Sequence, residues 1–354
     1  MCIRDRETMQ LIPVKPTIIL PENRNNSLSY TSNIIDITPL SERTLEKGNA
    51  KHFIEANTKE TDLFHLKNEC IVPVFSKDNE ITISHPNFIE TVWNAANKFF
   101  PNERFLEPDI RVSHVIKGRI PEAIHKPVNQ LLESDKTIYY ERMAFCFEIP
   151  TIYEDIEGNR LNLTIGGVRA YNHENLYSKK SVEKFKIFIG FTNKVCTNLC
   201  VSTDGYKSEL RVMSLEELFK HSLLLFQQYN PNRHLQLMSS FQNSYLTEHQ
   251  FAQLIGKSKL YQCLPNAQKK LLPNMEFGDT HINAVAKAYY NDKNFKIEEG
   301  ADAINLWKVY NLFTGANKNS YIDNLLDRSL NATDLVEGIN RALHGDRKYR
   351  WFIE

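Results

Sequence analysis

The pattern of apolar and polar residues changes period along the chain, and each change predicts a different kind of secondary structure. Residues 84–100 carry apolar side chains at helical spacing behind Ser84, a residue type that caps helices. From residue 110 to 212 the period is two, which predicts β-strands. After Ser214 the helical spacing returns. Strands grouped first and helices grouped second predict an α+β fold rather than an alternating parallel sheet.

The strand segments of the first half predict an antiparallel sheet of about five or six strands. Residues 154–159 contain Gly158 and form a turn, so the segments on either side of it predict a β-hairpin. Two shorter strand candidates, 70–75 and 81–83, precede the helix at 84–100. The main strand segments are residues 110–116, 139–152, 161–168, 185–191, 195–201 and 210–212.

Capping boxes mark two helix starts in the second half. Ser214 is followed by Glu217, and Thr247 is followed by Gln250, at the spacing that lets each pair satisfy the first helical amide groups. Further helices are predicted at 280–290, 301–313, 321–330 and 333–343. The second half is therefore predicted to be helical.

Three regions follow from these patterns. Residues 1–52 are rich in Asn, Ser, Thr and Pro and are predicted to be a flexible leader, whose first six residues resemble a translated sequencing-adapter remnant. Residues 53–213 are predicted to form a β-rich domain with one helix. Residues 214–354 are predicted to form a helical C-terminal region packed on it.

Composition indicates a globular chain with reduced cysteines. Apolar residues make up 42% of the 354 residues, and 43 basic side chains balance 43 acidic ones. There is no secretory signal and no apolar run that could cross a membrane, so a cytoplasmic location without membrane contact is expected. Five cysteines remain once Cys2 is set aside with the adapter-like residues, an odd number that argues against a disulfide framework.

Several motifs that often hold cofactors fail on their spacing. Gly256-Lys257-Ser258 resembles the end of a phosphate-binding loop, but Phe251 stands where the first glycine is needed. Gly166-Gly167 lacks the third glycine of a dinucleotide site. Cys196 and Cys200 do not have the spacing of a zinc knuckle and are interpreted as core thiols. We therefore expect no cofactor and no metal, and assign no catalytic residue.

The neutral total charge conceals two oppositely charged segments. Residues 133–157 hold seven acids and two bases, whereas residues 158–194 hold seven bases and two acids. Bases interleaved with aromatic residues are typical of surfaces that bind single-stranded nucleic acid. The alternative interpretation is that the two segments pair with each other across the sheet. The nucleic-acid hypothesis selects Arg160, Arg169, Tyr171, Tyr177, Lys179, Lys180, Lys184 and Lys186.

Two polar clusters have no assigned role. The first lies at 167–177 and includes His173 and Glu174, and the second lies at 305–328 and includes Asn311, Lys318, Asp323 and Arg328. Each cluster is consistent with a binding surface. Each is also consistent with helix caps and turns, where Asn and Gly are frequent.

Residues 53–58, 111–123, 166–180 and 195–206, together with the segment 305–329, resemble the uncharacterised bacterial family called domain of unknown function 3871. The resemblance spans residues 53–354. It implies an association with conjugative and other mobile elements, and it supplies no catalytic residue. More faintly, residues 195–199 and 311–314 with Asp323 resemble the phage/plasmid-like domain of unknown function 932, although Asn324 replaces the His that commonly follows the acid there.

These observations give three hypotheses. The first is a mobile-element accessory protein, without enzymatic activity, that binds DNA, and single-stranded DNA in particular, through residues 160–194. The second is a protein–protein interaction module that uses the C-terminal helices around Trp307, Tyr310, Asn311 and Tyr321. The third, and least favoured, is a hydrolase that uses Arg169, His173 and Glu174. The oligomeric state is open.

Overall fold

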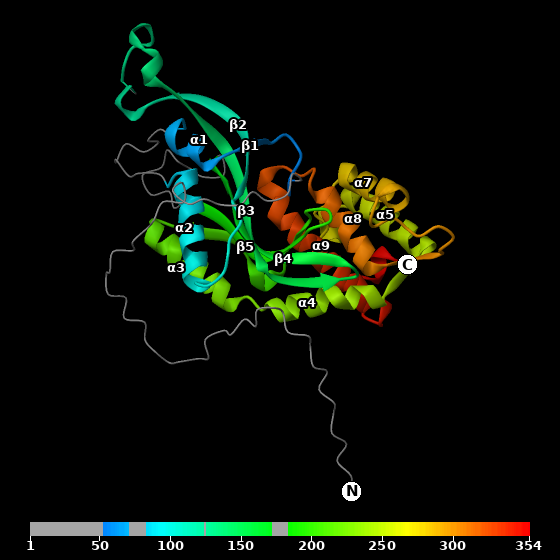
Figure 1. Cartoon of the computed structure of the whole chain (residues 1–354). Helices are drawn as coiled ribbons and strands as arrows, with labels where there is room; N and C mark the ends of the chain where they lie inside the picture. Colours follow the sequence, from blue (N-terminus) through cyan, green and yellow to red (C-terminus); the bar gives the residue numbers. More distant parts are fainter. Residues whose placement is uncertain (1–51, 71–82, 124, 172–182) are drawn as a thin grey trace.

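The computed structural model describes residues 52–70, 83–123, 125–171 and 183–354 (Figure 1). Apart from His52, the predicted leader lies outside these residues, as do most of the strand candidates at 70–75 and 81–83. Within the described residues the fold is α+β, as predicted. A curled antiparallel sheet occupies the first part of the chain, and helices dominate the second part.

The main sheet has seven strands, and consecutive strands from β1 to β6 pair with each other. The order is β1-β2-β3-β4-β5-β6, and β7 also pairs with β5. A two-residue turn with left-handed backbone at Glu157 and Gly158 joins β3 to β4, which confirms the predicted hairpin. The strands are β1 (Lys59–Thr61), β2 (Asp109–Arg119), β3 (Lys136–Ile156), β4 (Asn159–Ala170), β5 (Glu183–Asn193), β6 (Leu199–Cys200) and β7 (Tyr206–Val212).

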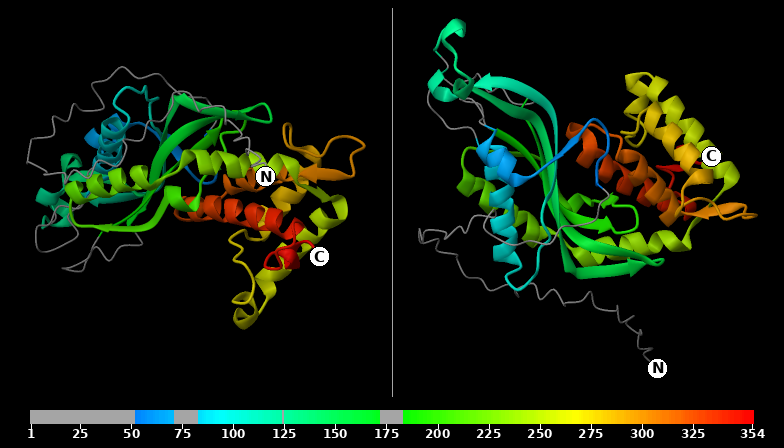
Figure 2. Two further views of the ribbon diagram at one scale, coloured as in Figure 1. Left: turned by 90° about the horizontal axis from the view of Figure 1, so that it is seen from below. Right: turned by 45° about the horizontal axis from the view of Figure 1, so that its top comes forward.

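Helices cover both faces of the sheet (Figures 1 and 2). On one face lie α2 (His85–Phe99) and α3 (Leu215–Gln228), and on the other lies α9 (Ile322–Leu343), behind which α8 (Leu306–Asn317) packs. The remaining elements are α1 (Leu63–Asn68), α4 (Pro231–Ser240), α5 (Glu248–Cys263), α6 (Asn266–Lys269) and α7 (Asp279–Asn291), with the short pair β8 (Tyr245–Thr247) and β9 (Ala303–Asn305).

The central strands are apolar on both faces because both faces are covered. Phe145 and Phe147 of β3 point toward α2, where Phe145 meets Phe88 at a ring distance of 5.2 Å. The intervening Ala144 points to the opposite face and packs with Leu325 of α9. Gly166 of β4 is required by this packing, since a Cβ there would lie 2.2 Å from the backbone oxygen of Phe145. The Gly166-Gly167 pair therefore serves sheet packing.

Helix starts follow the predicted caps closely. Ser84 Oγ accepts a hydrogen bond from the backbone amide of Asn87, and Thr247 with Gln250 forms the predicted capping box. Three predictions are wrong in detail. Residues 195–198 form a turn, so only Leu199–Cys200 of the segment 195–201 is a strand. The segment 301–313 begins with strand β9, and the two helices predicted between 321 and 343 are the single helix α9.

A long hairpin projects from the body of the protein (Figures 1 and 2). It consists of the end of β2, the start of β3 and the connection between them, residues 114–140, which we call the arm. Three short 3-10 turns form its tip: Pro121–Ala123, Val128–Gln130 and Glu133–Asp135. His114 has a left-handed backbone (φ 58°) where the arm leaves the body, a conformation that His adopts more readily than most residues.

Candidate functional site

The structure describes part of the predicted nucleic-acid-binding set. Tyr177, Lys179 and Lys180 lie outside the described residues, as do His173 and Glu174 of the first polar cluster. The other members lie on strands β4 and β5 or directly after β4, and they are Arg160, Arg169, Tyr171, Lys184 and Lys186. Their contacts decide which of these side chains a partner could reach.

Arg169 and Tyr171 belong to the protein interior. Arg169 is 1% exposed, and its guanidinium donates hydrogen bonds to the backbone oxygen of Ile83 and to the Glu183 carboxylate. The Tyr171 ring lies 4.5 Å from the guanidinium carbon and stacks on His85. The expectation that Arg169 and Tyr171 contact a nucleic acid is wrong, because both are buried and a buried charge has to be satisfied inside the protein.

Arg160 and Lys194 are held by groups of the sheet. The Arg160 guanidinium donates to the backbone oxygen of Pro150 at 2.8 Å and lies 3.8 Å from the centre of the Tyr153 ring. Lys194 Nζ lies 2.7 Å from the Glu148 carboxylate. At Lys194 the interpretation that acidic and basic segments pair across the sheet is therefore confirmed.

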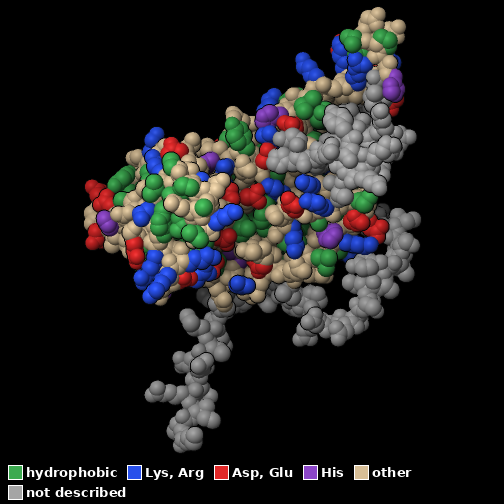
Figure 3. All heavy atoms as spheres, turned by 180° about the vertical axis from the view of Figure 1, so that it is seen from behind, with side chains coloured by type: hydrophobic (Ala, Val, Ile, Leu, Met, Phe, Trp, Pro, Cys, Tyr) green, Lys and Arg blue, Asp and Glu red, His purple; other side chains and the backbone are tan. Residues whose placement is uncertain are grey.

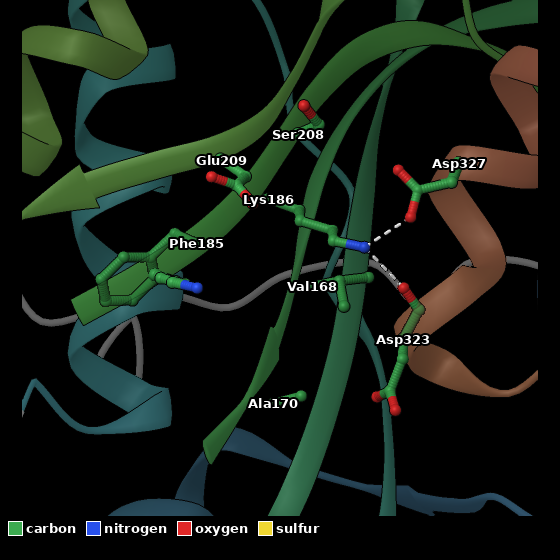
Figure 4. A pocket seen from close by; sticks show the side chains of 9 residues that line it. Val168, Ala170, Phe185, Lys186, Ser208, Glu209, Asp323 and Asp327 are labelled. Carbon is green, nitrogen blue, oxygen red and sulfur yellow. Dashed lines mark hydrogen bonds and ion pairs between the residues drawn. The ribbon is translucent and has the colours of Figure 1, made fainter. Parts of the chain in front are cut away.

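Lys184 and Lys186 line a pocket of about 240 Å³ between the sheet and helix α9 (Figure 4). Because alternate residues of a strand point to the same face, both lysines of β5 lie on the face that α9 covers. A break in the regular β5–β7 register, between Phe185 and Ile187, accompanies the pocket. The other lining residues are Val168, Ala170, Phe185, Ser208, Glu209, Asp323 and Asp327.

Ion pairs at this pocket join the sheet to α9. Lys186 Nζ lies 2.6 Å from the Asp327 carboxylate and donates a second hydrogen bond to the backbone oxygen of Asp323. The Tyr206 hydroxyl donates to the other oxygen of Asp327 at 2.6 Å. Burial, together with the charge of Asp327, raises the pKa of Tyr206, so this hydroxyl stays protonated and continues to donate. Lys186 therefore fastens β5 to α9.

The pocket is lined by more acidic than basic side chains. Two lysines face three carboxylates, those of Glu209, Asp323 and Asp327, although Arg142 lies 3.3 Å from Asp323 at the edge of this group. A polyanion would meet these acids at close range. The charges around the pocket are consistent with a structural contact and do not favour nucleic-acid binding there.

The second polar cluster also lies largely inside the protein. Asn311 is 1% exposed, and its amide oxygen accepts a hydrogen bond from Asn193. Lys318 is 8% exposed and donates to Thr197 Oγ1 at 2.7 Å. Arg328 is half-buried and donates to the backbone oxygen of Glu276. Of the two interpretations of this cluster, a binding surface or structural caps and turns, the contacts of Asn311 and Lys318 favour the structural one, because they hold the 193–198 turn against α8.

Exposed bases gather at the end of the molecule that carries the C-terminus (Figure 3). Arg341, Arg347 and Lys348 are exposed there, and Arg350 is half-buried. Lys257 of α5 lies beside them, with Nζ 5.0 Å from the centre of the half-exposed Trp351 ring. We call this surface the C-terminal face, and it consists of Lys257, Arg341, Arg347, Lys348, Arg350 and Trp351.

Packing of the last residues on α9 and α5 fixes this face. Tyr349 lies against Gly338, where a Cβ would come within 2.4 Å of the tyrosine ring. Phe352 is fully buried and packs against Trp351 and Tyr261. A signal for the face was present in the sequence, since the bases at 347, 348 and 350 alternate with Tyr349 and Trp351. Its connection to Lys257, about 90 residues earlier, required the tertiary structure.

Three of the six residues on this face carry charges outside any ion pair. Arg341 pairs with Glu337 and Asp346, and Arg350 pairs with Glu354. Within the part of the chain that the structure describes, Lys257, Arg347 and Lys348 form no ion pair. The face therefore combines basic side chains outside ion pairs with an accessible aromatic ring, although Lys348 also acts electrostatically on the Asp334 carboxylate.

The described residues show neither a cluster of His, Cys, Asp and Glu suited to a metal ion nor a helix long and apolar enough to cross a membrane. The described cysteines form no disulfide with one another. Gly256, Lys257 and Ser258 lie within helix α5.

A curled antiparallel sheet with helices on both faces defines the chain as an α+β protein. The sequence profile described as "Domain of unknown function, B. Theta Gene description (DUF3871)" matches residues 33–353, so the chain belongs to this family. No curated protein and no solved structure matches the chain. The fainter similarity to domain of unknown function 932 finds no support in these comparisons and stays a prediction.

Proposed function

We propose that the protein binds single-stranded nucleic acid through the C-terminal face. The observation that carries the proposal is the juxtaposition of Lys257, Arg347 and Lys348, all outside ion pairs, with the half-exposed ring of Trp351. Bases attract the phosphates, and an aromatic ring provides a surface on which a nucleobase stacks. Stacking of this kind favours single strands, whose bases are accessible.

The C-terminal face suits this function better than the predicted set on the sheet. On the sheet, Arg169 is buried, while Lys186 and Lys194 already pair with acids. A phosphate would have to displace these carboxylates, so its attraction to the lysines would add little binding free energy. On the C-terminal face, Arg347 and Lys348 lie outside such pairs, so a phosphate gains their attraction without that cost.

The resemblance adds the proposal that this binding serves a mobile genetic element as an accessory activity. The alternative, a module that binds another protein through Trp307, Tyr310, Asn311 and Tyr321, has less support. Trp307 and Tyr310 are fully buried, and Asn311 is 1% exposed. Only Tyr321, 53% exposed, could contact a partner from that set.

The test compares charge-neutralised variants in titrations of a labelled oligodeoxythymidine at two salt concentrations. The variant K257Q/R347Q/K348Q removes the unpaired bases of the C-terminal face. We expect it to bind at least about tenfold more weakly at low salt and to show a smaller salt dependence, by about two in the slope of log K against log salt. Wild-type protein should bind more weakly as salt rises.

Two control variants distinguish a loss of binding that is specific to the C-terminal face from a loss caused by the lower net charge alone. K287Q/K293Q/K296Q removes three exposed lysines outside the C-terminal face and has the same net charge as K257Q/R347Q/K348Q. It should nevertheless bind like the wild type. K184Q/K186Q tests the interpretation based on residues 160–194 and should also retain binding. Equal losses in all three variants, or loss only in K184Q/K186Q, would contradict the proposed site. Absence of binding at low salt would contradict the function.

A further inference from the structure

The indole ring of Trp351 is held from the protein interior by two buried aromatic rings. Phe352 is fully buried and lies 5.0 Å from the indole at an interplanar angle of 82°. Tyr261 is 6% exposed and lies 6.5 Å away. Edge-to-face contacts of this kind fix the position of a ring. The half-exposed Trp351 therefore presents its accessible surface on the side away from these two rings.

Lys257 covers part of that accessible surface. It precedes Tyr261 by four residues on α5, so both side chains lie on the same side of the helix and both reach Trp351. The Lys257 ammonium lies over the indole, 5.0 Å from the ring centre, and the side chain is half-buried. Lysine commonly packs its aliphatic stem on apolar surface in this way. The free protein thus keeps a cation on the ring where a base would stack.

The contact with the ring leaves the Lys257 ammonium available to a ligand. Within the described residues this ammonium forms no hydrogen bond and no ion pair in addition to it. Lys269 gives the contrast, because its Nζ lies 5.6 Å from the centre of the Tyr261 ring and also donates to the backbone oxygen of Gln262 at 2.9 Å. Lys269 is committed to the protein, whereas Lys257 leaves its ring at low cost, since a cation–π contact at an exposed site is weak.

A base and a phosphate both require Lys257 to leave the ring. A stacked base takes the place of the ammonium on Trp351, and the displaced ammonium then reaches a neighbouring phosphate of the same strand. Because the displacement occurs once for both contacts, each contact favours the other. Stacking of a base on an aromatic ring is stronger than an exposed cation–π contact, so the exchange is favourable when base and phosphate arrive together.

We propose that Lys257 exchanges the Trp351 ring for a phosphate when a nucleobase stacks there, so that this pair of residues selects strands with accessible bases. The inference rests on the proposed nucleic-acid-binding function and deepens it by naming what the site recognises, a base together with a neighbouring phosphate. A strand without bases gains only the phosphate contacts. It should bind the C-terminal face more weakly than a single strand of equal length that carries bases.

The test follows the Cε protons of Lys257 by NMR in protein labelled with carbon-13 at the lysine Cε. In the free protein the ring current of Trp351 should shift these protons upfield, and the variant K257M identifies their signal. Saturating oligodeoxythymidine should remove the upfield shift, because the ammonium leaves the ring. An oligomer of the same length built from abasic sites should bind at least about fivefold more weakly, since base stacking is lost.

Lys269 is the matched control, with its signal identified by K269M. Its own shift should persist when oligodeoxythymidine binds, because the hydrogen bond to Gln262 holds it over the buried ring of Tyr261. Bound oligodeoxythymidine that leaves the Lys257 signal upfield would overturn the inference, and the proposed function would stand. Equal binding of the abasic oligomer would overturn it too and reduce the proposed function to the attraction of phosphates. Absence of oligodeoxythymidine binding at low salt would overturn both.

Discussion

Buried polar residues hold the two ends of the main sheet to the surrounding helices. Arg169 links β4 to the start of α2 through Ile83, and to the start of β5 through Glu183. Its guanidinium also lies 4.5 Å from the centre of the Phe185 ring. Lys318 similarly ties the end of α8 to the 193–198 turn. The charges of these residues are satisfied by partners inside the protein. A sequence pattern does not distinguish such charges from those that bind a ligand.

The substitution Arg169→Ala should destabilise the protein strongly. Removing the guanidinium leaves the Glu183 carboxylate, whose side chain is 15% exposed, without its main partner, and breaking such a buried pair costs about 3–5 kcal/mol. The free energy of unfolding from urea titration measures the effect. Arg160→Ala on the same strand is the control and should cost less than about 1 kcal/mol, because Arg160 is exposed. Equal effects of the two substitutions would contradict the internal role of Arg169.

Buried histidines should make the protein less stable in mild acid. Burial, with Arg169 nearby, lowers the pKa of His85 from 6.5 to about 3, and burial lowers the pKa of His234 to about 4. Both are therefore neutral in the folded state, whereas the unfolded chain binds protons as the pH falls below about 6.5. Each histidine should remove up to about 1.4 kcal/mol of stability per pH unit from about 6.5 down toward its folded pKa.

Urea unfolding between pH 7 and pH 5 measures this effect, with H85Q/H234Q as the comparison. The double variant should be less stable overall, since each histidine makes a buried hydrogen bond. Its stability should nevertheless fall less steeply with pH than that of the wild type. Parallel pH profiles would show that these histidines titrate normally.

At the scale of helices and strands, local signals predicted most elements. The cap at Ser84, the capping box at Thr247 and the turn at Gly158 act within a few residues, so the sequence alone reveals them. The sequence does not reveal the turn at 195–198, because Val195 and Cys196 continue the apolar pattern of a strand, whereas the residues buried there are the polar Thr197 and Asn198. Thr197 adopts a left-handed backbone (φ 59°), which is unusual for a β-branched residue and is stabilised by contacts distant in sequence.

The contact between α8 and the 193–198 turn gives a test at this scale. Asn311→Ala should cost about 1–3 kcal/mol, because the buried amide of Asn193 loses its acceptor. Thermal or urea unfolding measures the loss. Asn324→Ala on the exposed side of α9 is the control and should change stability little. A neutral result at Asn311 would contradict the structural role assigned to the second polar cluster.

At the scale of the whole molecule, the distribution of charge matters more than its zero sum. On the main sheet Arg169 is buried and Lys186 is paired with Asp327, whereas exposed bases gather on the C-terminal face. Sequence analysis located the basic segment 158–194, but it could not show which carboxylates would meet those bases. Pairs such as Lys186 with Asp327, 141 residues apart, form only in the folded chain. The site proposed here therefore differs from those predicted from the sequence.

Photo-crosslinking of an oligodeoxynucleotide that carries 5-iodo-deoxyuridine, followed by mass mapping of the attached peptides, tests the central claim most directly. Because this photochemistry favours aromatic side chains in contact with the base, the account predicts attachment at Trp351, reduced by the K257Q/R347Q/K348Q variant and by added salt. Attachment confined to residues 160–194, or attachment at Trp351 that neither the variant nor salt reduces, would contradict it.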